Sequence, residues 1–417
     1  MTLSRSPQSW VIFAFLFGTS CSADSGWLYQ SRGNEFGAVR PGIEVLLEDS
    51  LHLVAGRSVG LLTNQTGVDA SGQSSIDRIY EHPDVDLVAL FAPEHGIRGT
   101  AEGGEEIEDG LDPKTALPIH SLYGTVRKPT PEMLVGIDVL LVDYQDIGAR
   151  YWTYVSSMTL AMEAAGEEDV PVVILDRPNP IGSATQGNIL DHRFGTFVGR
   201  FPIAMRHGMT PGELARYYRG EFGIEVDLHV VPAEGWRRDM TFADTGLPWI
   251  QPSPNMPNIE SAIHYPGTCL FEGTRLSVAR GTDRPFQQVG APWLDGNALA
   301  RTMNGYGLPG VRFDPVRFTP VSPGDRKFNG VEVEGVRLVM TSQEYDPTHA
   351  ALALLVETHR MSVSNWGWLE SHFDRLAGTD LLRLGIDEGA SVEELREGWD
   401  EDLEAFKRTR ERYLIYP

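Results

Sequence analysis

Cysteine is almost absent from this sequence, since Cys21 and Cys269 are the two thiols among 417 residues. Two cysteines exclude a structural zinc site of the usual four-ligand, cysteine-rich kind. They also exclude a small scaffold held together by several disulfide bonds. Because 41% of the residues are hydrophobic and 22% are charged, the chain is instead expected to fold around ordinary hydrophobic cores.

Positive charge is also scarce. Lys and Arg number 35 against 58 Asp and Glu, which gives a formal charge of −23. A protein that binds a phosphate backbone needs a clustered basic face, so the sequence predicts no nucleic-acid partner. Attraction to an anionic membrane surface through charge is disfavoured for the same reason. An anionic small substrate stays open, because a local group of arginines can oppose the overall field.

Long hydrophobic runs are missing as well, because no segment beyond the first twenty residues reaches the ~18 apolar residues of a membrane-spanning helix. Residues 1–22 instead predict an export signal, with Arg5 before the short apolar stretch Trp10 to Gly18. Small residues directly before Cys21 resemble a bacterial lipoprotein signal, in which that cysteine is acylated. Plain cleavage between Ser20 and Ala23 is the alternative. Either reading places the protein in the periplasm or cell envelope.

Four apolar runs of strand length, each followed by polar residues, dominate the first half of the chain. They span residues 57–63, 86–92, 137–142 and 171–175, and a fifth candidate covers 226–232. Such continuous runs are typical of strands that are buried on both faces. Helical spacing at 74–82 and 152–165, and a capping box from Thr210 to Glu213, place helices between them. The alternation predicts an α/β fold with a Rossmann-like parallel sheet over residues 43–262.

The region after about residue 260 has shorter strand-like pieces and more Gly and Pro. The pieces are 311–313, 318–321 and 331–340, followed by a helix at 350–360 and a charged helix from Ser391 to about Tyr413. We expect a smaller α+β domain over residues 263–417.

Several cofactor and catalytic motifs are missing. The sequence contains no Walker A, HExxH or GxSxG element, and the turn after Asn64 lacks the glycine fingerprint of dinucleotide binding. Residues 305–310 match GxGxxG literally but include Pro309 and precede a strand-like run, which makes the match a false positive. No two metal-ligating side chains have ligand spacing on one element. The sequence therefore predicts neither a cofactor nor a metal.

Polar residues follow four of the buried strands where each one ends. Because ligands of open parallel sheets bind outside the carboxyl ends of the strands, these residues point to one crevice. The other reading is that they cap helices and form turns. The residues are Asn64, Thr66, Glu94, His95, Asp143, Tyr144, Asp176 and Arg177.

Other loops combine rigid backbone with a few polar groups, as small-molecule sites require. Arg280 and Arg284 lie close together in an acidic protein and could clamp a carboxylate; an ion pair with Asp283 is the alternative. The remaining candidates are Arg206, His207, Asn255 and Glu272.

Six ordered motifs resemble those of the NamZ-type exo-β-N-acetylmuramidases, and the resemblance extends from about residue 43 to the C-terminus. They are LTNQTG at 62–67, PEHGIRG at 93–99, DYQDIGARY at 143–151, DRPNP at 176–180, PSPNMP at 252–257 and FEGT at 271–274. The resemblance implies a Rossmann-like domain followed by a smaller domain, with the active cleft between them. It also implies an enzyme that removes N-acetylmuramic acid from non-reducing ends of peptidoglycan fragments, such as a MurNAc–GlcNAc disaccharide. The family's catalytic assignment maps best onto Glu94.

Glycoside cleavage needs an acid that protonates the leaving oxygen and usually a second carboxylate. Glu94 is the candidate acid, and His95 is a candidate to tune it. The second group is Asp143, Glu272 or the substrate's own acetamide. Candidate sugar ligands are Asn64, Thr66, Tyr144, His207 and Asn255, and candidate cations for the lactyl carboxylate are Arg177, Arg206 and Arg280. Two other functions stay open: a lipoprotein that binds muropeptides without cleaving them, and a metal-dependent hydrolase.

Overall fold

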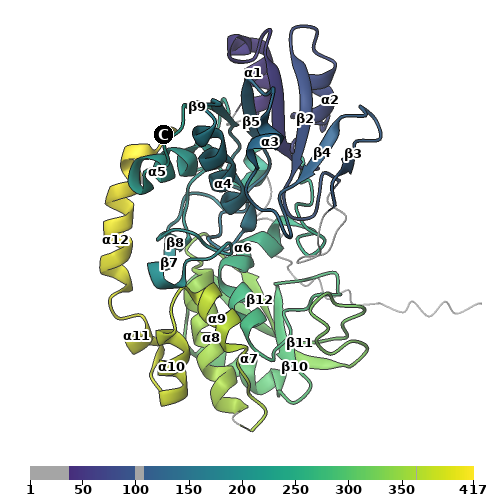
Figure 1. The fold of residues 1–417 in the computed structure, drawn as a ribbon. Coiled ribbons are helices and arrows are strands. Elements are labelled where there is room, and N and C mark those ends of the chain that lie inside the picture. Colours follow the sequence, from purple (N-terminus) through teal and green to yellow (C-terminus); the bar gives the residue numbers. More distant parts are fainter. Residues whose placement is uncertain (1–36, 99–107, 363) are drawn as a thin grey trace, which may run out of the picture.

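The computed structural model describes residues 37–98, 108–362 and 364–417. Two domains lie one above the other in Figure 1. The N-terminal segment that carries the predicted export signal and Cys21 lies outside the described residues. No helix in the described part of the chain is long and apolar enough to cross a membrane.

The first domain is built on a seven-stranded sheet. Its strands are β1 (Ser58–Thr63), β2 (Asp86–Ala92), β3 (Gly110–Leu111), β4 (Pro118–Ser121), β5 (Val139–Asp143), β6 (Val172–Leu175) and β9 (Leu228–Val231). They lie in the order β3-β4-β2-β1-β5-β6-β9, and all but β3 run parallel. The Rossmann-like parallel sheet predicted from the buried apolar runs is therefore confirmed. The sequence analysis missed β3 and β4.

Helices cover both faces of this sheet. α1 (Gly42–Asp49) and α2 (Ser75–Tyr80) share a hydrophobic core with one face, and α4 (Thr153–Glu167) and α5 (Pro211–Phe222) cover the other. A short α3 (Pro131–Leu134) precedes β5. The predicted capping box of α5 is present, with both reciprocal hydrogen bonds between Thr210 and Glu213.

The second domain has a three-stranded antiparallel sheet in the order β10-β12-β11, with helices packed on it. A two-stranded ribbon, β7 (Gln186–Ile189) with β8 (Ala204–Arg206), lies between the domains. The elements of the second domain are α6 (Ile259–Thr268), β10 (Gln288–Ala291), α7 (Gly296–Gly305), β11 (Val311–Phe318), β12 (Val333–Met340), α8 (Pro347–Met361), α9 (Glu370–Ala377) and α10 (Leu381–Glu388).

Two details of this region differ from expectation. The piece expected at 311–313 is the start of a longer strand, β11, and the piece expected at 318–321 shares only its first residue, Phe318, with that strand. The long charged helix expected from Ser391 to about Tyr413 is interrupted: α11 (Val392–Leu395) ends early, and α12 (Trp399–Arg410) starts anew. Gly398 between them has φ 87°, a left-handed conformation that glycine adopts readily and that ends a helix.

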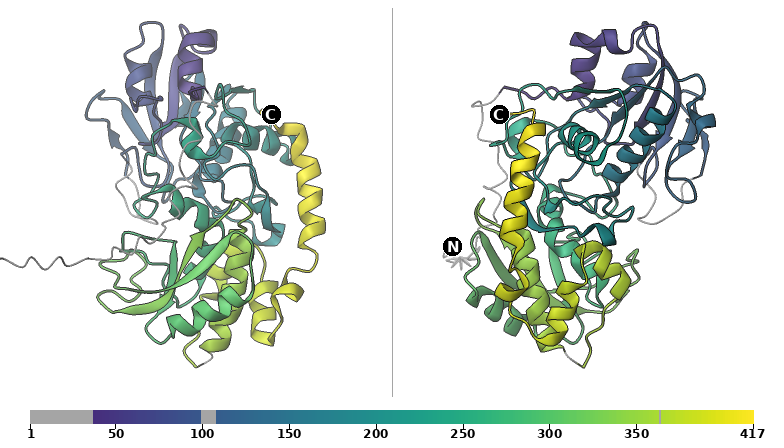
Figure 2. Two further views of the ribbon diagram at one scale, coloured as in Figure 1. Left: turned by 180° about the vertical axis from the view of Figure 1, so that it is seen from behind. Right: turned by 60° about the vertical axis from the view of Figure 1, so that its left-hand side comes forward.

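The C-terminal arm, residues 399–417, returns from the second domain to the first. In both views of Figure 2, α12 runs along the side of the molecule and ends at the Rossmann-like domain. The Tyr416 hydroxyl donates to Asp176 Oδ2 at 2.6 Å and accepts from the Ala233 N–H. Arg410 donates to the carbonyl oxygens of His207 and Gly208. The arm thus ties the two domains together next to the end of β6.

Candidate active site

The strand ends that sequence analysis singled out meet around the point where the strand order reverses. The chain places β2 on one side of β1 and β5 on the other, so the strand order reverses between β1 and β5, and open α/β sheets bind their ligands at the carboxyl ends of such strands. The polar residues that follow β1, β2, β5 and β6 are Asn64, Glu94, Tyr144 and Asp176, in that order.

Glu94 is half-buried and lies at the amino end of α4. Its Oε2 accepts a hydrogen bond from the hydroxyl of Thr153, the first residue of that helix. Helix amino ends favour carboxylates, because unpaired backbone N–H groups point outward there. His95 follows with φ 72°, which is unusual outside glycine, and its buried ring stands edge-on to Tyr154 at 6.4 Å. Strained backbone of this kind is concentrated at functional sites.

An aromatic cluster connects this loop to the second domain. Trp152 packs edge-on against Tyr154, with ring centroids 5.2 Å apart, and against Tyr265 of α6 at 5.6 Å. Tyr265 in turn contacts the ring of Phe286 at 4.7 Å. The hydrophobic core on this face of the sheet continues into the second domain, so the cluster fixes the position of one domain on the other.

Glu272 lies on the second-domain side of this cluster and forms an ion pair with Arg280. The Arg280 Nε and Glu272 Oε1 atoms are 2.6 Å apart, and the two side chains keep 16% and 15% of their surface exposed. Burial raises the pKa of the Glu272 carboxyl, but the charge and hydrogen bond of Arg280 outweigh this and hold it below its usual value. Arg280 therefore pairs with Glu272, whereas Arg284 has Asp283 beside it at 3.8 Å.

Asp143 is enclosed by the protein. Its two carboxylate oxygens accept hydrogen bonds from Arg177 at 2.6 and 3.0 Å, and Ser75 donates a further one. Arg177 also donates to the carbonyl of Val68. The side chains of Asp143 and Arg177 are 0% and 4% exposed. Their mutual pairing leaves no exposed surface on Asp143 for a sugar to contact.

Asn64 and Thr66 form a hydrogen-bonded turn at the end of β1. Asn64 Oδ1 accepts from the N–H and the hydroxyl of Thr66, and the Thr66 hydroxyl accepts from the Gln145 N–H at 2.8 Å. Both side chains are buried. These bonds join the ends of β1 and β5. Asn64 also lies beside the Tyr154 hydroxyl, which places its amide close to the Glu94 loop.

The remaining candidates are dispersed. The Tyr144 hydroxyl donates to the Tyr154 carbonyl at 2.9 Å inside the core. His207 is wholly buried, with Nε2 3.5 Å from an oxygen of Asp146. Asn255 is also buried, next to Ser253.

Arg206 lies at a separate cavity of about 410 Å³ between the domains. There it donates to Gln186 and to the carbonyl of Ile181, and burial lowers its pKa to about 10.

The structure thus gathers Glu94, His95 and Asn64 around Tyr154, and it connects them to Glu272 and Arg280 through the aromatic cluster. Sequence analysis missed Trp152 and Thr153, although an aromatic pair flanking the first residue of a helix was a usable signal. Among the described residues, no group of three or more His, Cys, Asp or Glu side chains could hold a metal ion.

Comparison with known proteins covers nearly the whole chain. The family described as exo-beta-N-acetylmuramidase NamZ, N-terminal, matches residues 59–260, and its C-terminal counterpart matches residues 263–416. The peptidoglycan beta-N-acetylmuramidase NamZ of Bacillus subtilis (strain 168) is 43% identical over 413 residues, which is 97% of this chain and 99% of that protein.

Two crystal structures of DUF1343 family proteins from Bacteroides fragilis NCTC 9343 are also similar. Their TM-scores are 0.85 and 0.75, with 37% and 33% identity. In each case the match covers 91% of this chain and 99% of the other.

Proposed function

The chain belongs to the NamZ family of exo-β-N-acetylmuramidases, and from this premise we propose that it releases N-acetylmuramic acid from non-reducing ends of peptidoglycan fragments. It is an exo-acting glycoside hydrolase. The observation that carries this conclusion is the 43% identity to a peptidoglycan β-N-acetylmuramidase along almost the full length of both chains. A partial match could reflect the shared fold alone, which by itself does not determine function.

Glu94 is proposed as the general acid that protonates the leaving glycosidic oxygen. It is half-buried, so it keeps a surface that substrate can reach. The hydrogen bond from the Thr153 hydroxyl fixes the position of one carboxylate oxygen of Glu94. It thereby also fixes the direction in which the other oxygen points. The buried rings of Trp152 and Tyr154 pack against each other on either side of Thr153 and fix the position of the residue that holds Glu94.

Glu272 is proposed as the second carboxylate, and it would stabilise the positive charge that develops on the sugar ring. This role requires an ionised group, and Arg280 holds the pKa of Glu272 below its usual value. Asp143 is not proposed for it, because its side chain is fully buried and paired with Arg177. The same pairing occupies Arg177, so that arginine is not proposed to bind the lactyl carboxylate.

The test is release of free N-acetylmuramic acid from a MurNAc–GlcNAc disaccharide by purified residues 24–417. We expect release that survives EDTA. Loss of release with EDTA would favour a metal-dependent hydrolase, and saturable binding without release would favour a capture protein.

Glu94→Gln should fold normally and lower turnover by about 10²–10⁴-fold, the usual contribution of a general acid. A matched Glu401→Gln change on the exposed face of α12 should leave turnover unchanged. A Glu94→Gln variant that turns over at nearly the wild-type rate would remove Glu94 from the mechanism.

We also propose that the enzyme is exported and anchored through an acylated Cys21, on the basis of the signal-like residues 1–20 before that cysteine. Expression in a bacterial host with radiolabelled palmitate should label the wild type and leave Cys21→Ser unlabelled. Equal labelling of the two proteins would contradict the anchor.

A further inference from the structure

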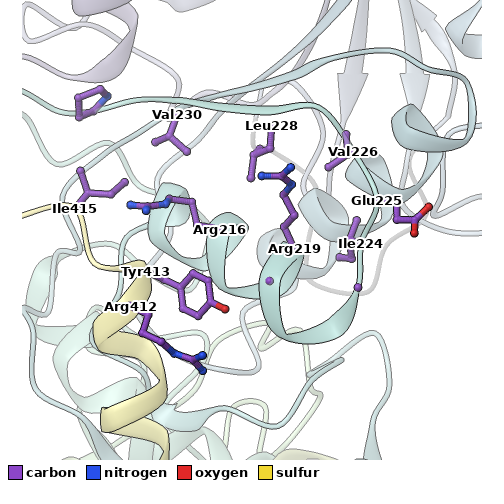
Figure 3. A pocket seen from close by; sticks show the side chains of 13 residues that line it. Arg216, Arg219, Ile224, Glu225, Val226, Leu228, Val230, Arg412, Tyr413 and Ile415 are labelled. Atoms are coloured by element: carbon purple, nitrogen blue, oxygen red, sulfur yellow. The ribbon is translucent and has the colours of Figure 1, made fainter.

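A pocket that the proposed reaction does not use lies at the edge of the Rossmann-like sheet. It has a volume of about 800 Å³ and is bounded by α5, β9 and the C-terminal arm (Figure 3). β9 is the fourth strand from β2 in the sheet order, and adjacent strands are ~4.8 Å apart, so the pocket is on the order of 20 Å from the strand that carries Glu94. It is therefore a site separate from the candidate active site.

Three arginines line this pocket. Arg412 is paired, because its guanidinium donates to Glu221 at 2.9 Å. Arg216 and Arg219 have no hydrogen bond or ion pair with any residue that the structure describes, and Glu225 is the one acidic residue of the lining. In a chain of formal charge −23, this lining holds more positive than negative side chains, and a concave surface of that kind attracts anions. The dipole of α5 favours Arg219 in its last turn, but Arg216 lies before that turn.

The rest of the lining is largely apolar, and an open strand edge lies next to it. Leu228 and Val230 of β9 face the pocket together with Ile224 and Ile415, and Figure 3 shows Arg216 and Arg219 projecting from α5 on the same side. β9 is the last strand of the sheet and pairs with β6 on its inner side. Within the described residues no strand pairs with its outer side. An exposed edge strand offers its backbone groups to an extended peptide, and neighbouring pockets then select the side chains.

We propose that this pocket binds an extended acidic peptide. The peptide would run along the outer edge of β9, with carboxylates on Arg216 and Arg219 and small apolar side chains against Leu228 and Val230. A peptide fits this pocket better than a simple anion does. It can place carboxylates on both arginines and bond to the backbone of β9, whereas a simple anion would leave the apolar lining and the strand edge unused. The inference goes beyond the proposed function, because this pocket lies apart from the candidate active site and takes a different kind of ligand.

The test measures the anisotropy of a fluorescein-labelled Ala-Glu-Leu-Glu-Ala peptide as the mature protein is titrated into it. The double variant Arg216→Gln/Arg219→Gln should raise the Kd at least tenfold, and each single variant should raise it less. The matched control Arg301→Gln, an exposed arginine of α7, should leave the Kd unchanged. The same peptide with Gln in place of Glu should bind at least tenfold more weakly to the wild type.

Three results would overturn the inference: no binding by the wild type, equal binding by the double variant, and sedimentation showing that the pocket is closed by a second copy of the chain. If tripolyphosphate at equal concentration displaces the peptide, the pocket is a general anion site and the peptide proposal is wrong. Release of N-acetylmuramic acid from the disaccharide should stay at the wild-type rate in the double variant. If the wild type releases none, the proposed function fails, while peptide binding still decides the inference.

Discussion

The buried ion pair between Asp143 and Arg177 gives the sharpest prediction, because sequence analysis had considered Asp143 for catalysis. Changing Asp143 to Asn leaves the Arg177 charge buried without its carboxylate, since both side chains are almost wholly enclosed. Breaking such a pair costs about 3–5 kcal/mol. At about 2.1 cal/mol/K of unfolding entropy per residue, a chain of 417 residues should then lose about 3–6 °C in Tm. The assay is thermal unfolding, combined with disaccharide hydrolysis well below the Tm.

A double variant separates the structural role of this pair from a catalytic one. Asp143→Asn combined with Arg177→Met removes both charges, and replacing a buried pair by apolar groups is often neutral. We therefore expect the double variant to recover most of the lost Tm, and both variants to keep kcat within about tenfold of the wild type. An Asp143→Asn protein with unchanged Tm and a kcat reduced more than 1000-fold would refute this reasoning and make Asp143 catalytic.

Three further predictions concern the side chains of Thr153, Asp176 and Cys269. Thr153→Val should lower kcat by about tenfold with little effect on KM, because it removes the hydrogen bond that positions Glu94. A kcat equal to that of the wild type would show that this bond has no such role. Burial raises the pKa of Asp176 from 3.8 to about 6, so the folded state holds this proton more tightly than the unfolded state. Stability should therefore fall by about 2 kcal/mol as pH rises from 4 to 6, and urea unfolding of Asp176→Asn should lack that slope. Burial raises the pKa of the Cys269 thiol well above its usual value, so iodoacetamide should label residues 24–417 only after unfolding; rapid labelling of the native protein would contradict the buried position.

The parallel sheet was predictable because its signal is local. The stretch 86–92 is apolar enough to be buried on both faces, and it was expected to be a strand over the range that β2 occupies. The hairpin-like edge of the same sheet was not predictable, since β3 has two residues and β4 four. The interruption before α12 depends on one left-handed glycine, Gly398, and a helical pattern of charges around it concealed the break.

The polar site residues were harder to assign, because their roles depend on partners far away in the sequence. Asp143 and Arg177 are 34 positions apart and neutralise each other. Asp176 accepts bonds from Thr210 at 2.7 Å and from Tyr416 at 2.6 Å, so it joins α5 and the C-terminal arm to the sheet. A strand-end carboxylate and a catalytic carboxylate look alike in sequence, and the geometry of their donors distinguishes them.

The Thr153 hydroxyl that donates to Glu94 is suited to an acid catalyst. Arg177 and Arg280 can only donate hydrogen bonds to Asp143 and Glu272, because a guanidinium has no acceptor. The Thr153 hydroxyl that contacts Glu94 can donate to a carboxylate and can also accept from a carboxylic acid. The contact therefore survives both protonation states through which a general acid passes in each turnover. Glu272 with Arg280 has the complementary property, because its pairing favours one charge state throughout the reaction. A glycosidase needs one carboxyl group as proton donor and another as charge stabiliser. The different donors of Glu94 and Glu272, which one aromatic cluster joins, suit them to these two roles.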